Sequence, residues 1–290
     1  RKNAEEIFAH WEAFADYGFN KSHATNYGII AVKTAWLKYY YRPEFMTALL
    51  SAWKNTTEKC AVYVAECQNM GISVLPPNIN SSNFDFSIEE LEDGKSAVRF
   101  GLGAIKNVGS APIETIIEAR SNRPFEDIND FIRRVDLRSI SKRVLECLIK
   151  VGALDSFGPR LALLRSIEQM VNASTSHFKA VEMGQMALFG ASPDAPGQIK
   201  LPNVSKSDPN EELEWEKELL GLYISDHPIN RLMRHISNKL SHNSNQFAEV
   251  EERAKVTIGG IVKRMRQLVT KKGDDMAFAT IEDNFGEMEI

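Results

Sequence analysis

The chain has 290 residues and a formal net charge of −4, from 35 Lys and Arg against 39 Asp and Glu. Its content of 43% hydrophobic and 26% charged residues is typical of a core-forming soluble chain and excludes the disordered and fibrous classes. At roughly 150 residues per domain the chain has room for about two domains. No apolar run approaches the roughly 18 residues that a membrane span needs, so we expect no membrane partner.

Residues 1–80 predict helices. Apolar side chains recur at helical spacing in a first helix that closes at Gly18, and a second helix runs from a possible cap at Ser22 to Pro43. The apolar positions of the second helix lie around much of its circumference, which predicts a well-buried helix. Two more helices are predicted, one over residues 44–53 and one over residues 57–70. The second of them ends at Gly71, a residue type that commonly follows a helix.

The three cysteines, Cys60, Cys67 and Cys147, have no CxxC spacing and an odd count. A disulfide framework and a zinc site are therefore disfavoured, and a reducing, cytoplasmic location is favoured. Cys60 and Cys67 lie seven residues apart on one predicted helix, which indicates two small core residues.

The pattern changes after residue 72. Apolar residues alternate with polar ones on both sides of the turn Glu92-Asp93-Gly94, which predicts a small β-hairpin, and helices follow over about 111–171. Residues 173–210, rich in Ser, Pro, Asp and Gly, predict a flexible segment. A helical connector is expected over 211–252, with helices at 211–222 and 229–240. A β-meander follows over 253–290, with strands at 256–258, 261–262, 268–269 and 276–281. The first and last residues fall inside predicted elements, so we expect a segment of a longer polypeptide.

An internal repeat is the strongest local signal. The run Gly103-Ala104-Ile105-Lys106-Asn107-Val108-Gly109 recurs 49 residues later as Gly152-Ala153-Leu154-Asp155-Ser156-Phe157-Gly158, and a helix is predicted after each copy. The pattern resembles a tandem helix-hairpin-helix motif, in which backbone N–H groups at the start of the second helix bind phosphates without reading bases. The candidate duplex-binding residues are Lys106, Asn107, Gly109, Ser110, Ser156, Gly158, Arg160, Lys142 and Arg143. Two departures weaken the pattern: Asn107 stands where Gly is frequent, and Pro159 removes one donor.

The charge of this region supports a polyanionic partner. Residues 99–165 hold twelve Lys and Arg against eight Asp and Glu, whereas residues 44–98 and 166–252 are acidic. The cations expected to surround the hairpins are Arg99, Lys106, Arg120, Arg123, Arg133, Arg134, Arg138, Lys142, Arg143, Arg160 and Arg165. The alternative is that Gly109 and Gly158 only permit tight turns between packed helices.

Two further motifs carry candidate sites. The island Gln185-Met186-Ala187-Leu188-Phe189 resembles the Gln-x-x-Leu-Phe signature with which bacterial proteins bind the sliding clamp, with Leu188 and Phe189 filling an apolar pocket and Gln185 at its edge. The alternative is an anchor that folds back on this chain's own core.

Lys21, Ser22 and His23 at a predicted helix N-terminus are the candidate cradle for a triphosphate or phosphate. Their alternative is a capping Ser22 with a solvated Lys and a packed His.

Taken in order, these motifs resemble the family of bacterial replicative DNA polymerase III alpha subunits, the C-family DNA polymerases. The resemblance covers essentially the whole chain. It runs through residues 19–50 with Tyr40-Tyr41-Arg42-Pro43-Glu44-Phe45-Met46, then 70–72, 75–80, 101–106, 142–146, the clamp-like island, 220–223 with His227-Pro228-Ile229, and 269–273.

The resemblance implies a mainly α, multi-domain segment: the end of the fingers domain (1–80), a β-hairpin with a tandem helix-hairpin-helix module (81–172), a flexible clamp-binding segment (173–210), a helical connector (211–252) and the incomplete start of an OB fold (253–290). It implies that Lys263, Arg264, Arg266, Lys271 and Lys272 bind single-stranded DNA. The implied partners are primer–template duplex, single-stranded DNA, the sliding clamp and other replicase subunits.

The family's chemistry is metal-assisted phosphoryl transfer at carboxylates of the palm domain. This chain contains no credible copy of that acidic cluster, so we expect neither a cofactor, a metal site nor polymerase activity from it, although magnesium is expected for the whole enzyme. Two alternatives stay open: a stand-alone DNA-binding accessory or repair module, and a helical scaffold without DNA affinity.

Overall fold

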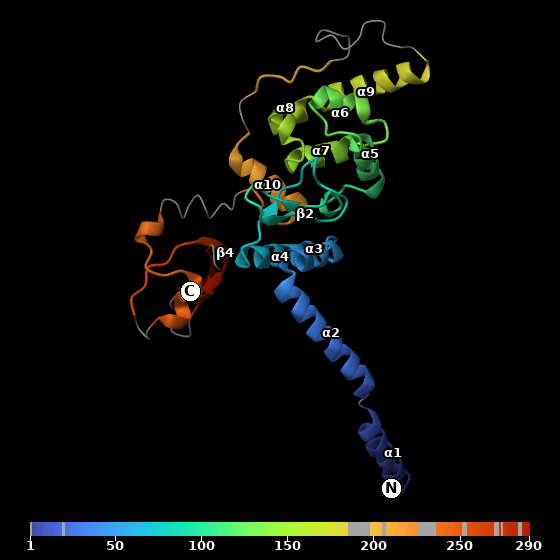
Figure 1. Ribbon diagram of the computed structural model, residues 1–290. Coiled ribbons are helices and arrows are strands. Elements are labelled where there is room, and N and C mark those ends of the chain that lie inside the picture. The colour runs from blue at the N-terminus through green and yellow to red at the C-terminus, as the bar shows by residue number, and fades with distance from the viewer. Residues whose placement is uncertain are drawn as a thin grey trace. The chain divides into compact units, whose positions relative to one another are not determined.

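The computed structural model describes residues 2–18, 21–184, 198–204, 207–225, 236–250, 254–269, 273, 275–283 and 286–290 (Figure 1). The chain divides into two compact units, one made of residues 1–74 and 86–99 and the other of residues 75–85 and 100–290. The predicted fold class is confirmed: the chain is mainly helical, with two small three-stranded sheets.

The helices of the first unit are α1 (Lys2–Gly18), α2 (Lys21–Tyr40), α3 (Arg42–Ala52) and α4 (Thr57–Asn69). The break between α2 and α3 comes where Pro43 stands in the first turn of α3, a position that needs no N–H donor. The prediction that the second helix is well buried is wrong, because no residue of α2 is buried in this structure. Apolar side chains that lie on every side of a helix need neighbours on every side, and in its own unit α2 extends away from α3 and α4 (Figure 1).

The predicted β-hairpin forms between β2 (Ser87–Glu90) and β3 (Ser96–Arg99), which pair antiparallel with Ile88 opposite Val98. The sequence did not reveal a third strand, β1 (Val74–Leu75), which pairs with β3 in the order β1-β3-β2. A two-residue strand has no alternation to detect, which is why periodicity missed it.

The second unit contains the helices around the internal repeat. In chain order they are η1 (Leu102–Ala104), α5 (Ser110–Arg120), α6 (Ile128–Arg134), α7 (Lys142–Lys150), η2 (Asp155–Phe157), α8 (Arg160–Arg165), α9 (Ile167–Glu182) and α10 (Pro209–Leu220). Their core includes the fully buried Phe100, Ile113, Phe131, Leu145 and Leu148. This core holds both hairpins in one packed body.

The flexible segment was predicted to begin at residue 173, but α9 continues to Glu182. Ser174, which in sequence favours a loop, is fully buried in this helix. Its hydroxyl donates to the carbonyl of Val135 (3.0 Å) and accepts from the amide of Leu137 (3.1 Å). Tertiary hydrogen bonds thus satisfy a residue that would otherwise disfavour the helix.

The C-terminal region forms an antiparallel meander of β4 (Ile261–Val269), β5 (Asp275–Glu282) and β6 (Glu287–Glu289). The two strands predicted at 261–262 and 268–269 are one strand with an irregularity between Val262 and Arg264, and the strand predicted at 256–258 is irregular. Most of the helix predicted over 229–240 lies outside the described residues. The short helices η3 (Ser237–Lys239) and η4 (Ser244–Glu249) precede the meander. No helix within the described ranges is long and apolar enough to cross a membrane.

Candidate nucleic-acid interface

The first hairpin, residues 105–109, joins η1 to α5 and is exposed at Lys106, Asn107 and Gly109. Asn107 has a φ of 65°. This left-handed conformation explains why Gly is frequent at this position, and Asn is one of the few side chains that adopt it routinely. The backbone amide of Lys106 donates to the carbonyl of Leu219 on α10 over 3.0 Å. The hairpin is therefore held at its base while its tip faces solvent.

Gly109 is the N-cap residue before α5, and among the described residues neither the backbone nor a neighbouring atom requires a glycine there. Its φ of −81° is open to any residue, and a Cβ added to it would meet no atom within 4 Å. Because Gly109 has no side chain, it leaves the amides of Ser110 and Ala111 uncovered at the positive end of α5. A glycine that neither packing nor backbone conformation explains is typical of close approach by a ligand.

A cation from the second motif reaches the first hairpin. Arg143, in the first turn of α7, is exposed and donates from Nη2 to Oδ1 of Asn107 over 3.3 Å. Its neighbour Lys142 is also exposed, but its ammonium is paired with Glu168 at 2.8 Å. The structure thus brings together Lys106, Asn107, Gly109, Ser110 and Arg143, which the sequence had placed in two separate segments. We call these five residues the first-hairpin site.

The second hairpin is different because the Leu201 side chain lies against its glycine, Gly158. Gly158 has a φ of 150°, and an added Cβ would lie 2.6 Å from Cδ1 of Leu201. The residues around Leu201 are held by Asn129, which accepts from the amide of Ile199 (2.7 Å) and donates to its carbonyl (3.2 Å). Gly158 is therefore explained by the fold itself, and Ser156 remains exposed beside it.

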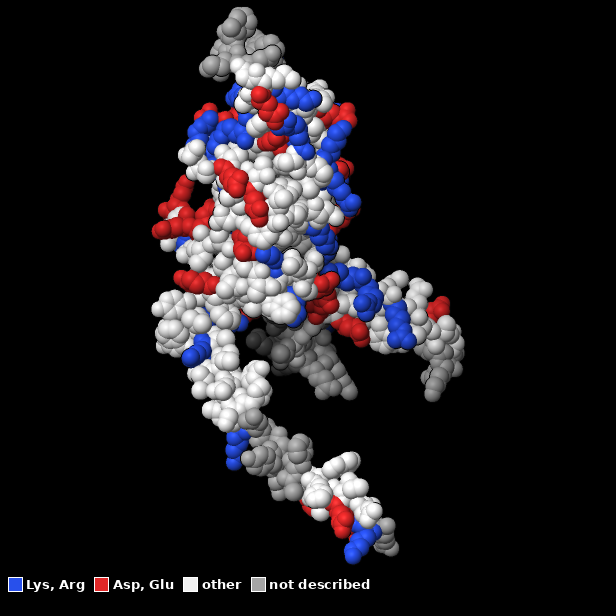
Figure 2. All heavy atoms as spheres, turned by 90° about the vertical axis from the view of Figure 1, so that its right-hand side faces the viewer, with Lys and Arg blue, Asp and Glu red and all other residues white. Residues whose placement is uncertain are grey.

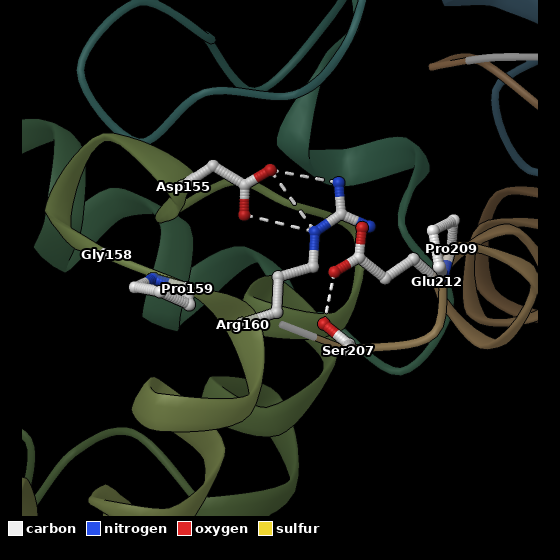
Figure 3. Close-up of a pocket in the computed structure, with 7 residues that line it drawn as sticks. All are labelled: Asp155, Gly158, Pro159, Arg160, Ser207, Pro209 and Glu212. Atoms are coloured by element: carbon white, nitrogen blue, oxygen red, sulfur yellow. Dashed lines mark hydrogen bonds and ion pairs between the residues drawn. The ribbon is translucent and has the colours of Figure 1, made fainter. Parts of the chain in front are cut away.

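The structure corrects the expectation for Arg160. This side chain is only 6% exposed and pairs with Asp155 (2.9 Å) and Glu216 (3.3 Å), so it cannot face a DNA phosphate. It forms one wall of a pocket of about 260 Å³, together with Asp155, Gly158, Pro159, Ser207, Pro209 and Glu212 (Figure 3). Burial raises the pKa of Asp155, against the opposing effect of Arg160. A pocket with more carboxylates than cations is a poor site for a phosphate.

Most of the cations predicted to surround the hairpins serve the fold instead. Arg99, Arg123, Arg134, Arg138, Lys142 and Arg160 form ion pairs with carboxylates, and Arg120 donates to the carbonyls of Ile79 and Ser82. In the part of the chain that the structure describes, the exposed cations of this segment without an ion pair are Lys106, Arg133, Arg143 and Arg165. Figure 2 shows Lys and Arg interspersed with Asp and Glu on the face it presents. The positive charge is therefore local, and two of these four unpaired cations, Lys106 and Arg143, belong to the first-hairpin site.

The other predicted sites are partly described. Lys21, Ser22 and His23 form the first turn of α2 in the first unit and are exposed, with the His23 ring 4.4 Å from that of Tyr27. Ser22 is thus inside the helix and does not precede it.

On β4, Arg264 and Arg266 are exposed and, two residues apart, share a face, whereas Lys263 pairs with Glu282 at 2.8 Å. That hydrogen bond raises the pKa of Lys263. Lys271 and Lys272 lie outside the described residues, as do Gln185, Leu188 and Phe189. Among the residues that are described, no group of three or more His, Cys, Asp or Glu side chains is placed to hold a metal ion.

Comparison with known proteins supports the predicted resemblance. The helix-hairpin-helix motif family matches residues 71–163, which include both copies of the repeat. Over 99% of its length the chain is 40% identical to the DNA polymerase III subunit alpha of Vibrio cholerae and to that of Escherichia coli K12. It is 36% identical over its whole length to the same subunit of Thermus aquaticus. The chain spans about a quarter of these relatives, 25%, 25% and 23% of their lengths.

Proposed function

We propose that this chain, which is related over its length to a segment of the bacterial DNA polymerase III alpha subunits, is the part of a replicative DNA polymerase that binds the backbone of the primer–template duplex. The observation that carries the proposal is Gly109, an exposed glycine at the start of α5 that neither the backbone nor the packing of the chain requires. The helix-hairpin-helix match over the same residues supports it.

The chemistry of the first-hairpin site suits a phosphate. The amides of Ser110 and Ala111 lie at the positive end of α5, and Pro112 in the same turn contributes no donor. Lys106 and Arg143 add two positive charges at the hairpin. Because amides and cations read phosphates and not base edges, binding is independent of sequence.

The experiment is a fluorescence anisotropy titration of a labelled duplex with this chain between 50 and 200 mM salt. If two to three phosphates are neutralised, affinity falls roughly 10- to 40-fold across this range. Duplexes of unrelated sequence bind equally well. Lys106→Ala with Arg143→Ala weakens binding, whereas the control Lys95→Ala, which removes an exposed cation paired with Asp93, does not. The proposal is refuted if the duplex affinity changes neither with salt concentration nor on the double substitution.

Clamp binding is a second part of the proposal and is supported by sequence alone. The residues Gln185, Leu188 and Phe189 match the clamp-binding signature and belong to a segment rich in small and polar residues. Leu188→Ala with Phe189→Ala abolishes association with a purified bacterial sliding clamp and leaves duplex affinity intact. If clamp association survives the double substitution, the island is only a packing anchor.

We assign two further contacts on the same basis. The exposed first turn of α2, with Lys21, Ser22 and His23, is proposed to meet the phosphates of an incoming nucleotide. The antiparallel meander β4–β6 is proposed to open an OB fold, whose Lys263, Arg264, Arg266, Lys271 and Lys272 bind single-stranded DNA. Lys263 is expected to contribute least to single-strand binding, because its ammonium is already paired with Glu282.

We propose no catalytic step for this segment. The described residues do not assemble a carboxylate cluster of the kind that would hold magnesium, so we assign magnesium-dependent phosphoryl transfer to the complete polymerase. We also propose the cytoplasm as its location and other replicase subunits as its partners. Similarity to polymerase subunits over 99% of the chain favours this function over a stand-alone repair module.

A further inference from the structure

Helix α10 lies outside the residues that match the helix-hairpin-helix family, yet it contacts the first hairpin and the first residue of α8, which follows the second hairpin. The carbonyl of Leu219 accepts the amide of Lys106 from the first hairpin at 3.0 Å. The carboxylate of Glu216 accepts from Arg160, which follows the second hairpin, at 3.3 Å from Nη1. Residues 216 and 219 are three apart and therefore lie on the same face of α10.

Both carboxylate oxygens of Glu216 are used. Oε1 accepts from the Arg160 guanidinium, and Oε2 accepts from the amides of Ile224 and Ser225, each at 3.1 Å. Glu216 is 1% exposed, so each of these hydrogen bonds is shielded from water. The side chain thereby fixes the rotation of α10 against the second hairpin and anchors the turn that follows Gly221.

We propose that Glu216 is a positioning residue for DNA binding by the first hairpin, and that it acts through α10. The inference rests on the proposed duplex-binding function. The Arg160–Glu216 pair sets the rotation of α10, and this rotation sets the direction of the Leu219 carbonyl. That carbonyl holds the amide of Lys106, next to the left-handed Asn107, and so keeps the tip of the hairpin and the start of α5 in one arrangement.

The sign of the effect separates this role from simple electrostatics. Glu216→Gln keeps the size of the side chain and removes one negative charge, which by charge alone would strengthen binding to DNA. The positioning role predicts the opposite, because a neutral amide in place of the carboxylate weakens the hold on Arg160 and frees α10 to rotate. The matched control is Glu218→Gln, which removes the same charge from an exposed position of the same helix.

The experiment measures duplex affinity of the chain at one salt concentration, together with thermal unfolding and hydrogen exchange of the Lys106 amide. We expect Glu216→Gln to bind about three- to tenfold more weakly and to exchange the Lys106 amide faster without DNA. Glu218→Gln binds as well as the parent chain or slightly better. Glu216→Asp retains the charge but shortens the side chain, and it weakens binding in the same direction. It also serves as the second variant if Glu216→Gln does not fold.

A double-mutant cycle completes the test. If Glu216 acts through the first hairpin, Glu216→Gln costs little further affinity once Gly109→Leu has blocked that hairpin. Equal losses in both backgrounds overturn the inference, as does unchanged or tighter binding by Glu216→Gln and Glu216→Asp. A parent chain that binds no duplex refutes the proposed function itself, so the two failures are distinguishable.

Discussion

Arg143 on α7 donates a hydrogen bond of 3.3 Å to the side chain of Asn107 in the first hairpin. The helix that begins the second motif therefore supplies a cation to the first motif. The two copies of the repeat do not form two equivalent sites: the glycine of the first hairpin is open and flanked by cations, whereas Leu201 lies against the glycine of the second.

Removal of this cation gives the first prediction. Arg143→Ala lowers duplex affinity about three- to tenfold for every sequence, and it reduces the slope of log affinity against log salt by about 1, because one phosphate contact is lost. Lys142→Ala removes a neighbouring cation that is paired with Glu168, so its effect is smaller. Equal effects of the two substitutions would show that position at the hairpin does not matter.

The second prediction concerns Gly152, whose φ is 79°. An added Cβ would collide with Nη2 of Arg160 and would lie 2.7 Å from Oδ2 of Asp155. Gly152→Ala therefore both strains the backbone and disturbs the ion pair between the buried Arg160 and the half-exposed Asp155. We expect a loss of about 2–4 kcal/mol in the free energy of unfolding. The control Gly94→Ala has a similar φ of 75° but open space around the Cβ, and it costs only about 1 kcal/mol. Urea denaturation measures the free energy of unfolding of both variants. Similar losses in Gly152→Ala and Gly94→Ala would contradict a role for the ion pair.

The third prediction is a pH dependence at Asp130. Burial alone would raise the pKa of this carboxyl, but hydrogen bonds from Arg123 and Arg134, each at 2.9 Å, outweigh burial and lower it. A lowered folded-state pKa means that the stabilisation is complete above the ordinary value of 3.8 and is lost as the pH falls through the lowered value.

Asp130→Asn therefore destabilises the chain by about 2–4 kcal/mol at pH 7, where it leaves two arginines without their carboxylate. The difference from the parent chain shrinks as the pH falls below 3.8. Urea midpoints at pH 7 and at pH 3 measure both effects. A difference that stays constant over this range would exclude ionisation of Asp130 as its cause.

The fourth prediction concerns the thiols. Burial raises the pKa of Cys60 and of Cys67 to about 11 and also raises that of Cys147. At pH 8 only about one Cys60 or Cys67 thiol in a thousand is then a thiolate. We expect a disulfide reagent such as DTNB to react slowly with the folded chain and rapidly with all three cysteines in guanidinium. Fast reaction of two thiols in the folded chain would contradict their burial.

The sequence was sufficient to predict the elements whose signals are local. The Gly repeat located both hairpins, Pro43 located the break between α2 and α3, and Gly71 marked the end of α4. Each depends on backbone chemistry that a single residue imposes.

Other features depend on tertiary contacts that no local pattern reveals. Arg160 stands in a basic segment after a hairpin, but its pairing with Glu216, 56 residues away, takes it out of the surface. Ser174 favours a loop in sequence. In the structure its hydroxyl donates to the carbonyl of Val135 and accepts from the amide of Leu137, which satisfies it inside a helix. The apolar side chains on every side of α2 predict burial, which requires neighbours that the described part of its own unit does not supply. The count of Lys and Arg in residues 99–165 overestimated the cations available to DNA, because most of them form ion pairs or hydrogen bonds within the fold.

The central claim is that the first hairpin binds duplex DNA through the start of α5, and duplex binding by Gly109→Leu tests it most directly. The backbone and the space around Gly109 accept a side chain, so we expect the free energy of unfolding to fall by no more than about 1 kcal/mol, the cost of a poorer N-cap residue. A leucine there blocks a phosphate from the amides of Ser110 and Ala111, so we predict at least a tenfold loss of duplex affinity at 100 mM salt, roughly 1.4 kcal/mol. Unchanged duplex affinity in a fully folded Gly109→Leu chain would contradict the account.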